Sequence, residues 1–137
     1  MGADENLLVL APTDIIYRLV LKKFWVNMTT GVVAPEAFYR RDHPADKNGL
    51  SILIAKHCPL DEIPEIKQRL GLSNIFAVIA IKCSDVDYLR LSIAPDKGKH
   101  PKHGNIKGLP YRDTPENNLI GINLAKKLAA KSWLVWP

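Results

Sequence analysis

The residues best suited to chemistry gather in one stretch, Asp96–Pro110, whose sequence is DKGKHPKHGNIKGLP. Four lysines lie in it without an intervening acid, and the formal net charge of the whole chain is only +5. They are Lys97, Lys99, Lys102 and Lys107. Lysines that alternate with glycines put ammonium groups beside exposed backbone N–H groups, which together suit a phosphate. We therefore predict a long loop, without strand or helix, that binds an anion. A solvated surface loop is the alternative.

Two histidines in this stretch, His100 and His103, have a spacing that also occurs in metal sites. His57 and Cys58 could add ligands. The surrounding lysines would repel a divalent cation, however, so we predict no metal site. Histidine is the usual general base near neutral pH, and His103 is our candidate for that role.

Two further polar residues stand in apolar, strand-like runs. Arg18 interrupts Ile15–Leu21, where an arginine is costly unless it is paired or faces a cleft. It is either a structural partner in the core or a bidentate ligand of an anion. Ser51 lies near the start of Leu50–Ala55 and lacks the GxSxG elbow of hydrolases. The candidate catalytic residues are thus Arg18, Ser51 and His103, and Tyr17 joins the four lysines as a candidate ligand contact.

Strands and helices that would position these residues follow from periodicity and capping signals. The expected strands are Ile15–Leu21, Leu50–Ala55, Ile75–Ile81, Tyr88–Ile93 and Trp133–Trp136, with a turn at Ser84–Asp87. One helix is expected at Pro59–Leu70, with Pro64 in its first turn. Another begins at Thr114-Pro115-Glu116, and its apolar arc contains Leu119, Ile120, Leu124 and Leu128.

These elements predict a single α+β domain over residues 1–137. We expect a mostly antiparallel sheet of about five strands, with two helices and the C-terminal helix packed on the sheet. The composition, 47% hydrophobic and 24% charged, is that of a globular chain. No apolar run is long enough to span a membrane, and the acidic start is unlike a signal peptide. We predict a soluble, cytoplasmic protein with no membrane partner and reduced cysteines.

Four short motifs together resemble a group of small bacterial proteins of unassigned function. They are Tyr17-Arg18, Pro35-Glu36-Ala37-Phe38, Gly49-Leu50-Ser51 and His103-Gly104-Asn105-Ile106. An arginine on the first strand followed by a serine-bearing strand is also similar to ADP-ribosyltransferase-like toxin domains. That resemblance implies that Arg18 holds the phosphates of NAD and that Ser51 stands beside it. It also implies a later glutamate on a strand, whereas the only glutamate after Glu65 is Glu116, at the start of a helix.

The sequence therefore favours a small domain that binds a phosphate-bearing ligand, either a nucleotide or an NAD-like molecule. In its enzymatic form such a domain would be of a toxin or defence type, with cofactors unknown. The alternative is a non-enzymatic module that binds nucleic acid or a protein through the basic loop. If the side chains of Arg18, Ser51 and His103 point to different faces instead of converging on one cleft, this catalytic set is wrong.

Overall fold

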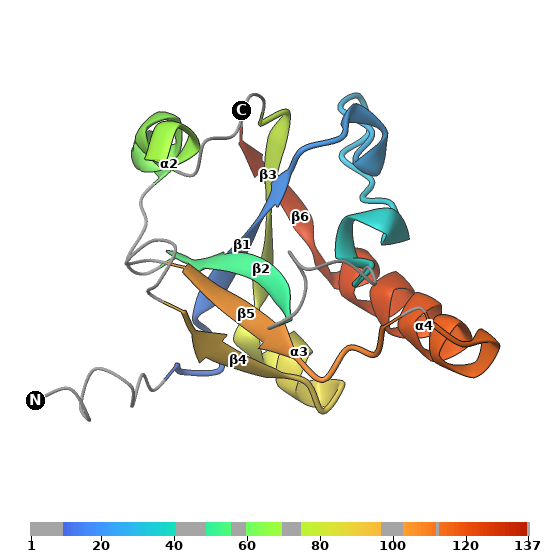
Figure 1. Cartoon of the computed structure of the whole chain (residues 1–137). Helices are drawn as coiled ribbons and strands as arrows, with labels where there is room; N and C mark the ends of the chain where they lie inside the picture. Colours follow the sequence, from blue (N-terminus) through green and yellow to red (C-terminus); the bar gives the residue numbers. More distant parts are fainter. Residues whose placement is uncertain are drawn as a thin grey trace, which may run out of the picture.

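The computed structural model describes residues 10–40, 49–55, 60–69, 75–96, 103–111 and 113–136 (Figure 1). Within them an antiparallel sheet has six strands, in the order β4-β5-β2-β1-β3-β6. The strands are β1 (Ile15–Val20), β2 (Leu50–Ile54), β3 (Ala77–Lys82), β4 (Ser92–Pro95), β5 (His103–Lys107) and β6 (Trp133–Trp136). The predicted α+β class is confirmed, with one strand more than expected.

The two central strands of the sheet, β1 and β2, pair with each other over fewer residues than each pairs with its outer neighbour. β1 and β3 align over six residue pairs and β2 and β5 over four. β1 and β2 share only Ile16↔Ile54 and Tyr17↔Leu53. In Figure 1 these two strands diverge, so the half β4-β5-β2 turns away from the half β1-β3-β6. The last pair that β1 and β2 share is Tyr17↔Leu53. Beyond it, Arg18 of β1 and the residues of β2 from Ile52 back to Ser51 are no longer paired with each other.

Side chains of the sheet bury into two separate apolar clusters, one on each face, because successive residues of a strand point to opposite faces. The larger cluster contains Ile16, Val20, Leu50, Ile52 and Ile106. It is covered by the 3-10 helix η2 (Pro35–Phe38), by α3 (Cys83–Tyr88) and by the C-terminal half of α4 (Pro115–Lys131). We call this side the α4 face.

The opposite side, which we call the α2 face, carries a smaller cluster. It contains Leu53 and Val78 from the sheet, with Ile63 and Ile66 from α2 (Ile63–Arg69). A 3-10 turn, η5 (Leu60–Glu62), precedes α2, so the predicted helix is present and Pro64 does lie in its first turn. In Figure 1 α2 lies at the upper left, at a distance from β4 and β5.

The last helix begins as its sequence predicts but packs differently. Thr114 is the N-cap, and its Oγ1 accepts a hydrogen bond from the backbone N of Asn117 at 3.1 Å. Ala125, Leu128 and Ala129 join the α4-face core. Leu119 and Ile120 remain 61% and 51% exposed, so their assignment to the buried face was wrong. The first half of α4 extends past the sheet, as Figure 1 shows.

Two expectations about the chain between residues 83 and 107 were also wrong. The predicted turn at Ser84–Asp87 and the start of the predicted strand at Tyr88 belong to α3. This helix forms because its first backbone N–H groups are bonded from outside: Cys83 N donates to Asp14 O and Ser84 N to Pro12 O. Arg90, with φ of 61°, then turns the chain into β4.

The second correction concerns the expected loop. Its second half, His103–Lys107, is strand β5, paired with both β2 and β4. Its residues have little intrinsic strand preference, so the pairing on both sides decides their conformation. Gly104 permits that pairing, because a Cβ there would lie 2.9 Å from the carbonyl oxygen of Ala94.

Candidate functional site

Ser51 and His103 meet on the α2 face of the sheet. Ser51 lies opposite Asn105, and His103 lies opposite Leu53, so the two side chains are diagonal neighbours on paired strands. Ser51 Oγ and His103 Nε2 are 2.6 Å apart. His103 is only 1% exposed, whereas Ser51 is half-buried. The hydroxyl of a half-buried serine is thus hydrogen-bonded to an imidazole that is buried.

The second ring nitrogen of His103 fixes the direction of that hydrogen bond. Nδ1 lies 3.1 Å from the backbone carbonyl oxygen of Asp96, which can only accept a hydrogen bond. Nδ1 must therefore carry the proton. In the neutral ring Nε2 is then the acceptor, and Ser51 donates its hydroxyl hydrogen to it. This is the orientation in which an imidazole can take a proton from a hydroxyl group.

Asp96 and Asn105 complete a polar network around the histidine. The Asp96 carboxylate oxygen Oδ2 lies 3.7 Å from His103 Nδ1 and accepts a hydrogen bond from Asn105 Nδ2 at 3.2 Å. The backbone also holds Asp96 in place, since its N–H donates to the carbonyl of His103 at 2.9 Å. Asn105 is only 4% exposed. An imidazolium at His103 would therefore have a carboxylate on its Nδ1 side.

Neither Asp96 nor Asn105 was among the candidates from the sequence. One signal was available: His103 and Asn105 are two residues apart, which puts both on the same face of any strand. That signal required the segment to be recognised as a strand. Asp96 follows β4, and only the pairing of β4 with β5 brings it opposite His103.

Lys107 shares this face with the network. It follows Asn105 by two residues on β5, and it lies opposite the exposed Ser92 of β4. Ser51 therefore has Asn105 directly across from it, with His103 and Lys107 at the two diagonal positions. Tyr17 is on the same face of β1, but it packs against the apolar α2-face cluster. Of the two predicted ligand contacts that the structure describes, Tyr17 and Lys107, Lys107 is the one beside the hydroxyl–imidazole pair.

Arg18 lies on the other face. It is two residues from both Ile16 and Val20, so it shares the α4 face with these two core residues. Its guanidinium is 5.7 Å from the ring centroid of Trp25. Its Nη1 donates to the backbone carbonyl of Ser51 and its Nε to that of Ala37, both at 2.8 Å. Arg18 thus reaches Ser51 through the backbone, where β1 and β2 have diverged. Its guanidinium and the Ser51 hydroxyl are on opposite sides of the sheet, so the three predicted catalytic side chains do not converge on one cleft, and only Ser51 and His103 of that set lie together.

The remaining candidate lysines, Lys97, Lys99 and Lys102, lie outside the described residues, as do His100, His57 and Cys58. Among the residues that the structure describes, no three His, Cys, Asp or Glu side chains are grouped to hold a metal ion. The helices of that same part of the chain include none that is long and apolar enough to cross a membrane. Cys83 is buried and forms no disulfide within the described residues.

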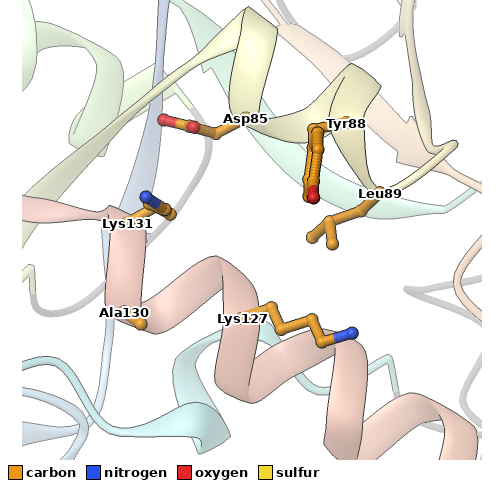
Figure 2. A pocket seen from close by; sticks show the side chains of 6 residues that line it. All are labelled: Asp85, Tyr88, Leu89, Lys127, Ala130 and Lys131. Carbon is orange, nitrogen blue, oxygen red and sulfur yellow. The ribbon is translucent and has the colours of Figure 1, made fainter.

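A hollow lies away from these residues, between α3 and α4, with a volume of about 160 Å³. Figure 2 shows Tyr88 and Leu89 on its α3 side and Lys127 on its α4 side. Tyr88 is 87% exposed, so this is a surface groove between two helices. None of its lining residues belongs to the Ser51–His103 network.

No family model, curated protein or solved structure matches the chain significantly. A proposal for its function therefore has to come from the geometry of the site.

Proposed function

We propose that this chain is an enzyme that acts on a phosphate-bearing ligand of the nucleotide or NAD-like class. The ligand would lie on the α2 face, over β2 and β5. The observation that carries the proposal is the hydrogen bond from the Ser51 hydroxyl to the buried imidazole of His103, at 2.6 Å. This hydrogen bond joins a half-buried serine to the acceptor nitrogen of a buried imidazole, which can act as its base.

In the proposed complex Lys107 pairs with a phosphate of the ligand. It has the diagonal position next to Ser51, on the side away from His103. An ammonium group there would neutralise phosphate charge within reach of the hydroxyl. His103 takes a proton in the reaction, and Asp96 stabilises the imidazolium that results.

The NAD-like class within this proposal comes from the likeness to ADP-ribosyltransferase-like domains alone. Arg18 lies on β1 and Ser51 on β2, but the Arg18 guanidinium is on the opposite face from the Ser51 hydroxyl. Among the described residues Arg18 donates hydrogen bonds to the backbone carbonyls of Ala37 and Ser51, which helps to hold η2 and β2 in place. Phosphate recognition then falls to Lys107 and to the lysines that precede β5 in the sequence.

Binding of nucleotides tests the proposal directly. NAD, ATP and inorganic pyrophosphate, each tested separately, should include at least one compound that raises the melting temperature of the protein. A ligand at a hundred times its Kd adds about 2.7 kcal/mol to the free energy of unfolding. Lys107→Gln should reduce that shift, whereas Lys126→Gln, a change at an exposed lysine of α4, should preserve it.

Turnover of the ligand should then depend on the Ser51–His103 pair. Incubation with the ligand that binds should release a product, and His103→Gln should lower kcat by about a hundredfold or more. If no nucleotide shifts the melting temperature and a single-stranded RNA binds with a steep salt dependence, the enzyme proposal is wrong. The basic module, the alternative from the sequence, would then be correct.

A further inference from the structure

From the geometry of the α2 face we infer that Ser51 is a covalent nucleophile toward phosphorus, activated by His103. This inference deepens the proposed function and rests on it for the class of substrate, a phosphoanhydride or phosphodiester of a nucleotide. It goes beyond it in naming the atom that reacts. The argument depends on the direction of one hydrogen bond, on the partners of the imidazole and on the exposure of Ser51.

The direction of the hydrogen bond comes first. Because Nδ1 donates to the Asp96 carbonyl, Nε2 accepts the Ser51 hydrogen and holds the oxygen at 2.6 Å. The proton that must leave Oγ as it attacks already points at the atom that will receive it. The nucleophile, its base and the group that orients the base thus form one continuous series.

The partners of the imidazole favour its charged form once the proton has moved. The imidazolium would donate from Nδ1 to the Asp96 carbonyl, with the Asp96 carboxylate at 3.7 Å. Asn105 keeps that carboxylate in place through its 3.2 Å hydrogen bond. Asp96 and Asn105 act through His103 and touch no substrate in this scheme, so they are positioning residues.

Exposure favours Ser51 as the reacting group over His103 itself. His103 is 1% exposed and Ser51 is half-buried, so of the two residues Ser51 is the one that keeps surface for contact with a ligand. The diagonal position of Lys107 places a cation on the side of Ser51 away from the base, where a phosphate would carry its charge.

The step balances without a further reactant. Ser51 Oγ forms a bond to phosphorus, and the bond from phosphorus to the leaving oxygen breaks. The proton of the hydroxyl moves to His103 Nε2 and then to the leaving oxygen. Water then attacks phosphorus while His103 takes its proton, and the bond from phosphorus to Ser51 Oγ breaks. His103 returns the proton to Oγ, which releases the phosphate product and restores the serine hydroxyl.

A fluorophosphonate probe tests this inference on the intact chain. Oγ should attack phosphorus and expel fluoride, which adds one probe mass per folded molecule, and peptide mapping should find that mass on Ser51. Ser51→Ala should abolish the adduct. Ser92→Ala is the matched control, since Ser92 is an exposed serine on the same face of the neighbouring strand β4, and its labelling rate should be unchanged.

The supporting residues should change the labelling rate to different degrees. His103→Gln should lower it by about a hundredfold, in line with the usual contribution of a general base. Asp96→Asn should lower it about tenfold and weaken its dependence on pH, which a purely structural role of Asp96 would not do. Circular dichroism and the melting temperature show whether each variant is folded.

The wild-type protein alone can overturn the inference. If it is folded and takes up no probe, or if the adduct maps to another residue or persists in Ser51→Ala, Ser51 is not the nucleophile. Nucleotide binding without labelling would remove this inference and leave the proposed function intact. Labelling without nucleotide binding would keep the reactive serine and remove the nucleotide as its substrate.

Discussion

Arg18 and Ser51 are both polar interruptions of apolar strands, and they lie on opposite faces of the sheet. Arg18 satisfies backbone carbonyls of two other segments, Ser51 and Ala37. Ser51 turns its hydroxyl toward another side chain, the imidazole of His103. An arginine that bonds backbone supports the fold, whereas a hydroxyl aimed at a buried base is equipped to react. The hydrogen-bond partner of a polar residue therefore indicates the role of that residue better than its position in an apolar strand does.

The reason for the difference lies in how β1 and β2 pair. They align at only two residue pairs and then diverge, so strand hydrogen bonds from β1 no longer reach Ser51. Instead, Nη1 of Arg18 donates a hydrogen bond to the backbone carbonyl of Ser51. β2 and β5 stay paired over four residues, so the opposite face there is regular and side chains meet at predictable positions. Arg18 thus compensates for the missing pairing between β1 and β2, whereas Ser51 meets His103 because β2 and β5 remain paired.

The largest expected effect on stability is at Arg18. Arg18→Ala should lower the free energy of unfolding by about 3 kcal/mol, because two part-buried carbonyls lose charge-assisted donors. Arg18→Lys should recover little of this, since one ammonium cannot reproduce the planar fork of the guanidinium. Urea unfolding measures both values. A variant of unchanged stability that loses nucleotide binding would reverse the comparison and make Arg18 a ligand residue.

A smaller effect is expected at the Ser51–His103 pair. Ser51→Ala should cost about 1–2 kcal/mol, because it leaves Nε2 of a buried imidazole without its hydrogen-bond donor. A double-mutant cycle with His103→Gln should give a coupling free energy of about 1 kcal/mol between the two side chains. The same cycle between Ser51→Ala and Arg18→Ala should give additive effects if Arg18 contacts only the backbone of Ser51. Strong coupling between those two would contradict the separation by faces.

The smallest effect is expected far from both regions, at the start of α4. A hydrogen bond from Asn117 Nδ2 to Asp113 Oδ1, at 2.9 Å, is the main reason that the pKa of Asp113 is lowered from its usual value. A lowered folded-state pKa means that the charged carboxylate stabilises the fold at pH above the usual aspartate pKa. That contribution disappears as the pH falls through the lowered folded-state value.

Asp113→Asn should therefore unfold slightly more easily than wild type at neutral pH and equally easily in strong acid. Unfolding curves recorded across the acid range measure the difference. Asn117→Ala should remove most of the same pH dependence, and the double variant should add little to it. This exposed pair supplies a baseline, so that pH effects on the reactivity of Ser51 can be separated from pH effects on stability.

Local chemistry determined a large part of this fold. The N-cap at Thr114 with Pro115 after it begins α4, and the β-branched run Ile15–Val20 forms β1. These features depend on neighbours a few residues away, which the sequence shows directly. The polar residues worth testing were visible for the same reason, since Arg18 and Ser51 contrast with the apolar residues around them.

Tertiary structure decided what those residues do. β5 is a strand because β2 and β4 flank it, and its small and polar residues carried no signal of that. α3 exists because residues of the chain before β1 receive its first N–H groups. Only strand register brings Ser51, His103 and Asp96 together, across 52 residues from the serine to the histidine. Arg18 was expected to share their cleft, but the alternation of side chains along β1 and the divergence of β1 from β2 put it on the opposite face.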